Sequence, residues 1–189
     1  DVRQLAKRWG VPVWNRPAMA CLSSRFPYGT AVTSEGLRQV DRAERFMKDL
    51  ICEQLRVRHH DHVARIELPA DELTSLVADV ARRRLIADEL SSLGYRRVTL
   101  DVIGFRSGSM NEALGRGEDA PVPDAATVFT QMGLEGRAES DEQILCLQLE
   151  ETALMKLIDP QARMTLAGEL RHTATPYVAF DLTSGPPTA

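Results

Sequence analysis

The chain has 189 residues, of which 43% are hydrophobic and 26% charged, the balance of a folded globular protein rather than a disordered one. A net charge of −4 and an aromatic content of 5% argue against a general nucleic-acid-binding surface, because such surfaces need positive charge and rings that stack on bases. No apolar run approaches the roughly 20 residues of a membrane span, and three separated cysteines without a CxxC pair favour a reducing, cytoplasmic setting.

The first 29 residues combine a short helix with an irregular loop. Val2 to Trp9 has helical spacing and Gly10 follows as its stop, while Val11 to Val13 is a candidate strand. From Trp14 to Gly29, prolines, glycines and polar residues interrupt every periodicity. This stretch is therefore predicted to be a loop.

The next segment, up to residue 112, has the pattern of a small α+β unit. The predicted elements are a helix over 34–51 with Thr33 as its N-cap, strands over 54–60 and 62–68 joined by a turn at His60-Asp61, one long helix over 69–93 and a strand over 95–105. A glycine- and serine-rich turn follows at 104–112. This order predicts a small mixed sheet covered by helices.

The composition changes after residue 112. Glycines and prolines over 115–123 indicate a linker, and helices are predicted over 140–158 and 160–170, with a strand over 177–182 and a frayed tail over 184–189. No internal repeat is evident. We therefore divide the chain into residues 1–29, an α+β domain over 30–112, and a linker with a largely helical extension over 113–189.

Cys21 is the first candidate for chemistry. It lies in the predicted loop with Ser24 and Arg25, and a nearby guanidinium favours the thiolate, which is the nucleophilic form of cysteine. The alternative is a buried cysteine that acts as a small hydrophobic residue, with Arg25 on the surface.

Arginines are the second candidate. Arg56 and Arg58 are two residues apart on a predicted strand, so both guanidinium groups face the same side and suit a phosphate or carboxylate. The alternative is a solvated face paired with acids such as Glu67. Arg106 lies in the turn at 104–112, whose backbone N–H groups can form an anion nest, although an ordinary turn has the same sequence pattern.

Two further groups of polar residues have simpler interpretations. Glu44 follows the apolar stripe of the first long helix and could accept a proton or orient an arginine, although an exposed glutamate is the default. His59, His60 and His62 suggest zinc, but adjacent strand residues face opposite sides and no cysteine or carboxylate has a ligand spacing. We predict no metal site at these histidines.

Taken in order, these motifs resemble the LarE family of ATP-dependent sacrificial sulfur transferases, within the PP-loop superfamily. The resembling segments are Trp14-Asn-Arg-Pro-Ala-Met-Ala-Cys-Leu-Ser-Ser-Arg-Phe-Pro-Tyr-Gly29, Leu37-Arg-Gln-Val40 with Ala43-Glu44, Arg56-Val-Arg-His-His60, Ala64-Arg-Ile-Glu67, Val98-Thr-Leu-Asp101 and Gly104-Phe-Arg-Ser-Gly-Ser-Met-Asn-Glu112. The resemblance covers about residues 1–112. It implies that residues 1–29 are the end of a PP-loop α/β domain and that residues 30–112 carry sulfur transfer.

The resemblance also implies a reaction, in the synthesis of the nickel-pincer nucleotide cofactor of lactate racemase. ATP adenylates a carboxylate of a pyridinium mononucleotide, and a cysteine displaces AMP and then gives up its sulfur. The implied catalytic residues are Cys21, as donor, and Glu44. The implied substrate-binding residues are Ser24, Arg25, Arg56, Arg58 and Arg106. An iron–sulfur cluster is the alternative sulfur source in this family, and three cysteines could ligate one. Because Cys146 lies outside the resembling part of the chain, we favour the sacrificial route.

The PP-loop signature, Ser-Gly-Gly-x-Asp-Ser, does not occur in the 189 residues. We therefore expect ATP and Mg²⁺ to be bound mainly by an absent N-terminal half, and expect the chain alone to be inactive. The alternative is a remnant that has lost catalysis. The family resemblance also implies a homo-oligomer. Two alternatives remain open: a non-catalytic anion-binding or oligomerisation module, and a relative that thiolates tRNA.

Overall fold

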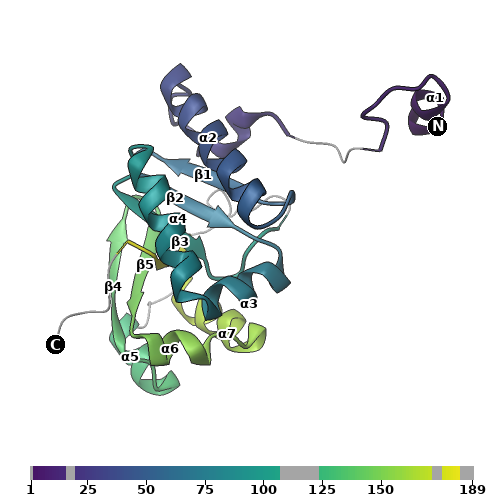
Figure 1. The fold of residues 1–189 in the computed structure, drawn as a ribbon. Helices are drawn as coiled ribbons and strands as arrows, with labels where there is room; N and C mark the ends of the chain where they lie inside the picture. Colours follow the sequence, from purple (N-terminus) through teal and green to yellow (C-terminus); the bar gives the residue numbers. More distant parts are fainter. Residues whose placement is uncertain (1, 16–19, 107–123, 172–175, 184–189) are drawn as a thin grey trace.

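The computed structural model describes residues 2–15, 20–106, 124–171 and 176–183 (Figure 1). The elements of the first half are α1 (Val2–Arg8), the 3-10 helix η1 (Leu22–Arg25), α2 (Ser34–Leu50), β1 (Arg56–His60), β2 (Val63–Glu67), α3 (Ala70–Ala78), α4 (Val80–Ser92) and β3 (Arg97–Asp101). Those of the second half are α5 (Ala125–Met132), β4 (Gly136–Asp141), β5 (Ile144–Leu149), α6 (Glu151–Lys156), α7 (Pro160–Leu170) and β6 (Tyr177–Asp181). The predicted turn beyond residue 106, the linker over 115–123 and the tail over 184–189 lie outside the described residues.

The strands form one mixed sheet in the order β1-β2-β3-β6-β5-β4, which confirms the predicted α+β class. Its hydrophobic face carries residues such as Val57, Ile66 and Leu100, which join Met47 of α2 and Leu166 of α7 in one buried core. The helices of both halves therefore cover the same face of the sheet (Figure 1).

The two halves repeat one order of elements. The order α-β-β-α-α-β occurs first from α2 to β3 and again from α5 to β6. The central strands of the sheet, β3 and β6, pair antiparallel, and the strand order on either side of them is mirrored. The sheet is thus approximately two-fold symmetric, a repeat that the sequence does not reveal.

The helix pairs of the two halves share the same capping device. Asp79 caps the N-terminus of α4 and Asp159 caps that of α7. Four residues after each cap, Arg83 and Arg163 donate hydrogen bonds to carbonyls at the end of the preceding helix. Arg83 also pairs with a carboxylate of α6, and Arg163 donates to a hydroxyl of α3, so each half is tied to the other by the equivalent residue.

Three sequence predictions are wrong in detail. The helix predicted over 140–158 is instead the β4–β5 hairpin followed by the short α6, because the apolar run at 144–149 fits a strand buried on both faces as well as a helix. The single helix over 69–93 is broken at Asp79, which ends α3 and caps α4. No strand forms at Val11 to Val13. The predicted helices over 34–51 and 160–170 and the strand over 177–182 are confirmed to within one residue.

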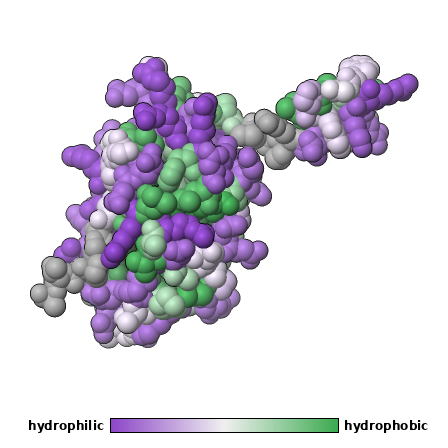
Figure 2. All heavy atoms as spheres, viewed as in Figure 1, coloured by the Kyte–Doolittle hydropathy of each residue, from purple (hydrophilic) through white to green (hydrophobic). Residues whose placement is uncertain are grey.

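The other face of the sheet is polar. Side chains of β1, β2 and β3 on this face include Arg58, Arg65, Glu67 and Asp101, all of them buried. A small apolar cluster shares the face: Val63, Ile144, Cys146, Tyr177 and Ala179. On the helix-covered side, apolar surface gathers over α3 and α4 among hydrophilic side chains (Figure 2). None of the helices in the described part of the chain has the length and hydropathy of a membrane span.

Candidate functional site

Cys21 is exposed at the start of η1, within the predicted irregular loop. Its Sγ lies 2.8 Å from the hydroxyl oxygen of Ser23, while the hydroxyl of Ser24 donates to the Cys21 carbonyl at 2.8 Å. The hydrogen bond from Ser23, together with that from the Ser24 backbone, lowers the pKa of the Cys21 thiol. The loop therefore presents an accessible thiol whose thiolate form is favoured.

Arg25 and Glu44 form a buried clamp behind this loop. Arg25 donates from Nε and Nη2 to the two carboxylate oxygens of Glu44, at 2.7 and 3.0 Å, and the residues are 1% and 2% exposed. The third nitrogen of Arg25, Nη1, donates to the carbonyls of Ala20 and Cys21. Glu44 also accepts from the backbone N–H of Val57, so the clamp joins the cysteine loop to α2 and β1.

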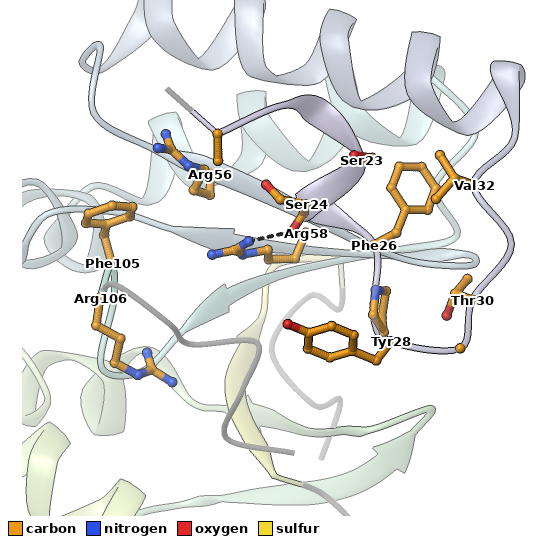
Figure 3. A pocket seen from close by; sticks show the side chains of 13 residues that line it. Ser23, Ser24, Phe26, Tyr28, Thr30, Val32, Arg56, Arg58, Phe105 and Arg106 are labelled. Atoms are coloured by element: carbon orange, nitrogen blue, oxygen red, sulfur yellow. Dashed lines mark hydrogen bonds between the residues drawn. The ribbon is translucent and has the colours of Figure 1, made fainter. Parts of the chain in front are cut away.

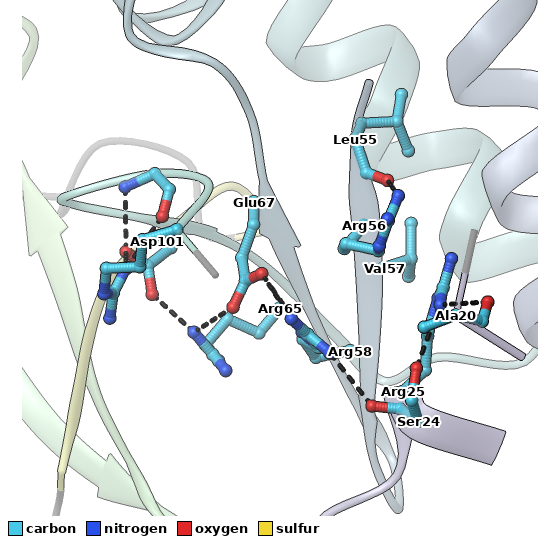
Figure 4. A network of polar contacts seen from close by, with 12 residues as sticks. Ala20, Ser24, Arg25, Leu55, Arg56, Val57, Arg58, Arg65, Glu67 and Asp101 are labelled. Carbon is cyan, nitrogen blue, oxygen red and sulfur yellow. Dashed lines mark hydrogen bonds and ion pairs between the residues drawn. The ribbon is translucent and has the colours of Figure 1, made fainter. Parts of the chain in front are cut away.

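A chain of buried ion pairs continues along the polar face (Figure 4). Arg58 donates from Nε and Nη2 to Glu67 Oε2, at 3.0 and 2.9 Å, and from Nη1 to the carbonyl of Ser24. The other oxygen of Glu67 pairs with Arg65 at 3.0 Å, and Arg65 pairs in turn with Asp101. Each carboxylate thus fixes guanidinium groups that would otherwise repel one another.

Asp101 holds the end of this chain in place. Its Oδ1 accepts from Arg106 Nη1 at 2.9 Å and from the backbone N–H groups of Ile103 and Gly104. Burial opposes ionisation, but Arg65, Arg106 and these donors together hold the pKa of Asp101 below its ordinary value. Asp101 is therefore a fixed negative charge that directs Arg106.

A cavity of about 570 Å³ lies between the cysteine loop and these arginines (Figure 3). Its polar lining residues are Ser23, Ser24, Tyr28, Thr30, Arg56, Arg58 and Arg106. The apolar lining includes Phe26 and Phe105, and the Arg56 guanidinium lies over the Phe105 ring at 5.2 Å from its centroid. Burial and the nearby Arg25 lower the pKa of Arg56. Cys21 is not itself among the lining residues, but Ala20 and Ser23 on either side of it are, so its loop forms the border of the cavity.

The charge balance of this region suits an anion. Five arginines, at positions 25, 56, 58, 65 and 106, face three carboxylates, at 44, 67 and 101, and each of these carboxylates is within hydrogen-bond distance of at least one arginine. The excess charge is positive and three of the arginines reach the cavity. A cavity of this size with aromatic and guanidinium groups fits a small phosphorylated or carboxylated ligand with a planar ring.

The predicted site residues fall into two groups. Ser24, Arg56, Arg58 and Arg106 line the cavity, with Cys21 at its border. Arg25 and Glu44 lie behind the cavity and contact each other. The interpretation of Glu44 as the residue that orients an arginine therefore agrees with the geometry, whereas the alternative of an exposed glutamate does not, because Glu44 is buried. For Arg58, features of both interpretations are present: its side chain pairs with the acid Glu67, and it also lines the cavity where an anion could bind.

Sequence reasoning missed the second layer of the site. Arg65 and Asp101 were not recognised, although the alternation of charged residues on β2 places Arg65 and Glu67 on the same face as Arg58. Tyr28 and Phe105 line the cavity from loops, where no periodicity marks them. His59 and His60 lie on opposite faces of β1, as expected: His59 contacts Phe26 and Tyr95, whereas His60 contacts Tyr177 on the polar face. His62 lies in the turn before β2.

Comparisons with known proteins agree with the resemblance. No protein-family model matches the chain. Over 118 residues, 62% of the chain, it is 43% identical to the pyridinium-3,5-bisthiocarboxylic acid mononucleotide synthase of Lactiplantibacillus plantarum. It is also 43% identical over 114 residues to an uncharacterized protein of Synechocystis sp., and 23% identical over 107 residues to one of Methanocaldococcus jannaschii.

The chain spans only 40–42% of the length of these three relatives. Within the matched part, the resemblance to the LarE family is confirmed.

Proposed function

We propose that this chain, whose matched residues are similar to the LarE family, is the sulfur-donating part of an ATP-dependent sulfur transferase. It would convert carboxylates of a pyridinium mononucleotide to thiocarboxylates, in the synthesis of a nickel-pincer nucleotide. The observation that carries the proposal is the position of Cys21. Its thiol is exposed and has a lowered pKa, and the loop that carries it lines a cavity together with three arginines.

The cavity supplies the contacts that such a substrate needs. Arg56 uses one N–H group on the Leu55 carbonyl, and its other N–H groups have no partner among the described residues. Arg106 is held at the cavity by Asp101, so its side chain reaches a ligand with little further loss of conformational freedom. A phosphate and two carboxylates would pair with these groups, and the pyridinium ring would lie against the aromatic lining.

The chemistry assigned to Cys21 follows from its thiolate. A substrate carboxylate is first adenylated by ATP, with release of pyrophosphate. The Cys21 thiolate attacks the acyl carbon, AMP leaves, and a thioester forms. Water then takes the Cα proton of Cys21, the electron pair of that C–H bond forms the Cα=Cβ double bond of dehydroalanine, and the Cβ–S bond breaks so that the thiocarboxylate leaves with its electron pair. Arg25 and Glu44 take no part in bond making in this scheme; they hold the loop that carries the thiol.

ATP and Mg²⁺ belong, in this proposal, to the part of the relatives that the chain does not match, since the PP-loop signature is absent from its sequence. The sacrificial route is preferred to an iron–sulfur cluster because Cys146 is buried within β5, where burial raises the pKa of its thiol to about 12. Its sulfur is enclosed by the apolar cluster of Val63, Ile144, Tyr177 and Ala179, whereas Cys21 is exposed in its loop.

A cytoplasmic homo-oligomer that acts on a small molecule and not on nucleic acid completes the proposal. In support, Leu5 and Trp9 of the α1 segment are 47% and 74% exposed, and apolar side chains of this size are typical of subunit contacts. Light scattering on the purified protein tests this, and a strictly monomeric mass at all concentrations contradicts the oligomer.

Ligand binding tests the proposed function on the chain itself. Titration calorimetry with a pyridinium-3,5-dicarboxylate mononucleotide is expected to give binding that Arg56→Gln and Arg106→Gln each weaken by about 10-fold or more, because a hydrogen bond to a charged group is worth about 1.5–3 kcal/mol. Arg45→Gln, on the exposed side of α2, is the matched control and should leave affinity unchanged. Equal effects of all three substitutions, or no binding, would refute the assignment of the cavity.

A further inference from the structure

Two hairpin turns from opposite edges of the sheet meet across its polar face. Asp61 and His62 form the turn between β1 and β2, and Glu142 and Gln143 form the turn between β4 and β5. These turns are equivalent in the repeat, and they come together because the sheet curls strongly: His62 Nε2 lies 3.0 Å from Oδ1 of Asp141. One ligand atom each of Asp61, His62 and Glu142 lie within 4.8 Å of one another.

We propose that Asp61, His62 and Glu142 bind a divalent transition-metal ion that joins the two halves of the sheet. One imidazole nitrogen and two carboxylate oxygens form a donor set that suits Zn²⁺, Mn²⁺ or Co²⁺. The site is separate from the arginine-lined cavity and does not depend on the proposed sulfur transfer.

The geometry around His62 fits a metal ligand. Two ligand atoms about 2.1 Å from a common ion are about 3.0–3.4 Å apart in octahedral or tetrahedral coordination. His62 Nδ1 and Asp61 Oδ2 are 3.3 Å apart. With the ring proton on Nε2, a shared cation would fit this separation, in place of the hydrogen bond that a proton on Nδ1 would make.

A carboxylate on the far side of the ring fixes the tautomer that ligation requires. Asp141 forms an ion pair with Arg97, whose Nη1 lies 2.9 Å from Oδ2. Its other oxygen accepts from His62 Nε2, which therefore carries the ring proton, and the lone pair of Nδ1 is directed to the turns. This arrangement of carboxylate, histidine and metal is the usual support of a histidine ligand.

An independent observation comes from the adjoining cavity. A space of about 300 Å³ is lined by His60, Asp61, Glu142 and Gln143. His60 is 3% exposed, and its Nδ1, like Oε1 of Gln143, has no hydrogen-bond partner among the described residues. Because His60 Nε2 accepts from Arg65, the Nδ1 of the neutral ring is a donor. Water bound to the proposed ion would accept from His60 and donate to Gln143, satisfying both groups.

The site would brace the substrate cavity. Pro27 and Thr30 line both this space and the arginine-lined cavity, so a bound ion would fix the wall between them. Asp61 and Glu142 have backbone φ values of 51° and 54°, a region that non-glycine residues seldom adopt. Coordination of both side chains would offset the cost of holding these turns together.

Cobalt binding to the full chain tests the proposal, because Co²⁺ reports its ligands by colour. After treatment with a chelator, one equivalent of Co²⁺ is expected to bind with weak visible bands and without the intense near-ultraviolet band of a thiolate complex. His62→Ala and Glu142→Gln should each weaken binding at least about 10-fold, and Asp141→Asn by about 10- to 100-fold. Glu169→Gln, an exposed acid on α7, is the control and should leave affinity unchanged.

Circular dichroism of each variant without metal establishes that it is folded. The proposal is overturned if Co²⁺ does not bind, or if Glu142→Gln and Glu169→Gln have the same affinity as the unsubstituted chain. A thiolate band that disappears in Cys21→Ser would place the metal at the cysteine loop instead and would equally overturn it.

Discussion

Replacing Glu44 by glutamine tests the buried clamp behind the cysteine loop. The substitution keeps the size of the side chain and removes its charge. It leaves the guanidinium of Arg25, which is 1% exposed, without the carboxylate that accepts two of its hydrogen bonds. The positive charge then remains buried without a carboxylate partner, next to loop carbonyls, a hydroxyl and the amide of the new glutamine.

The expected loss of stability follows from these contacts. Removing one partner of a buried ion pair costs about 3–5 kcal/mol. The amide oxygen of glutamine can still accept one bond, from Arg25 or from the Val57 backbone, which returns about 1 kcal/mol. The free energy of unfolding should therefore fall by about 2–4 kcal/mol, a large part of the ~5–15 kcal/mol typical of a domain.

Urea denaturation followed by circular dichroism measures this loss. With a slope of about 2 kcal/mol per molar urea, the midpoint for Glu44→Gln should fall by about 1–2 M. Glu53→Gln, an exposed glutamate in the loop after α2, is the matched control and should change stability by no more than about 0.5 kcal/mol. Equal midpoints for the two variants would show that the clamp does not hold the loop.

Three further predictions concern the same region. Cys21 should be alkylated by iodoacetamide faster than the other two cysteines, and Ser23→Ala should shift its pH–rate profile to higher pH, as followed by mass spectrometry; an unshifted profile would exclude the hydrogen bond as the cause. Because the pKa of Asp101 is lowered on folding, the stabilisation by its carboxylate is complete above the ordinary aspartate pKa and is lost as pH falls through the folded value. In Asp101→Asn the midpoint of urea denaturation should therefore fall less steeply at acid pH than in the unsubstituted chain, and an equally steep fall would contradict this. Gly104→Ala should destabilise the fold by about 1–3 kcal/mol, because φ is +86° and a Cβ would lie 2.4 Å from a carbonyl oxygen. Gly168→Ala, in a helix with open space around the glycine, should stabilise the fold by about 0.5–1 kcal/mol, and thermal melts that rank the two variants the other way would contradict this.

The sequence allowed the first half of the fold to be predicted closely, because its elements have clear periodicity and punctuation. Thr33 caps α2 through its side chain, accepting from Gly36 at 3.0 Å. The prediction of a helix over 140–158 failed because its apolar residues have no period that separates a buried strand from a helix. The segment at 144–149 lies in a strand covered on both faces, and its helical spacing is coincidental.

The candidate site was predictable residue by residue, but its organisation was not. The spacing of Arg56 and Arg58 was enough to place both at one face of β1. The buried carboxylates that hold the arginines could not be inferred, since the pairing of Glu67 with two guanidinium groups depends on strand register across the sheet. The meeting of the two hairpin turns depends on the curl of the whole sheet, which no local pattern encodes.

Intact-protein mass spectrometry tests most directly whether Cys21 gives up its sulfur. The chain is combined with the PP-loop half of a relative and supplied with ATP, Mg²⁺ and the pyridinium dicarboxylate mononucleotide. We predict that each thiocarboxylate formed is matched by one chain that has lost one hydrogen sulfide, with the loss located at Cys21 and absent from Cys21→Ser. Thiocarboxylate formed while the mass of the chain stays unchanged would contradict the account, because the sulfur would then come from another source.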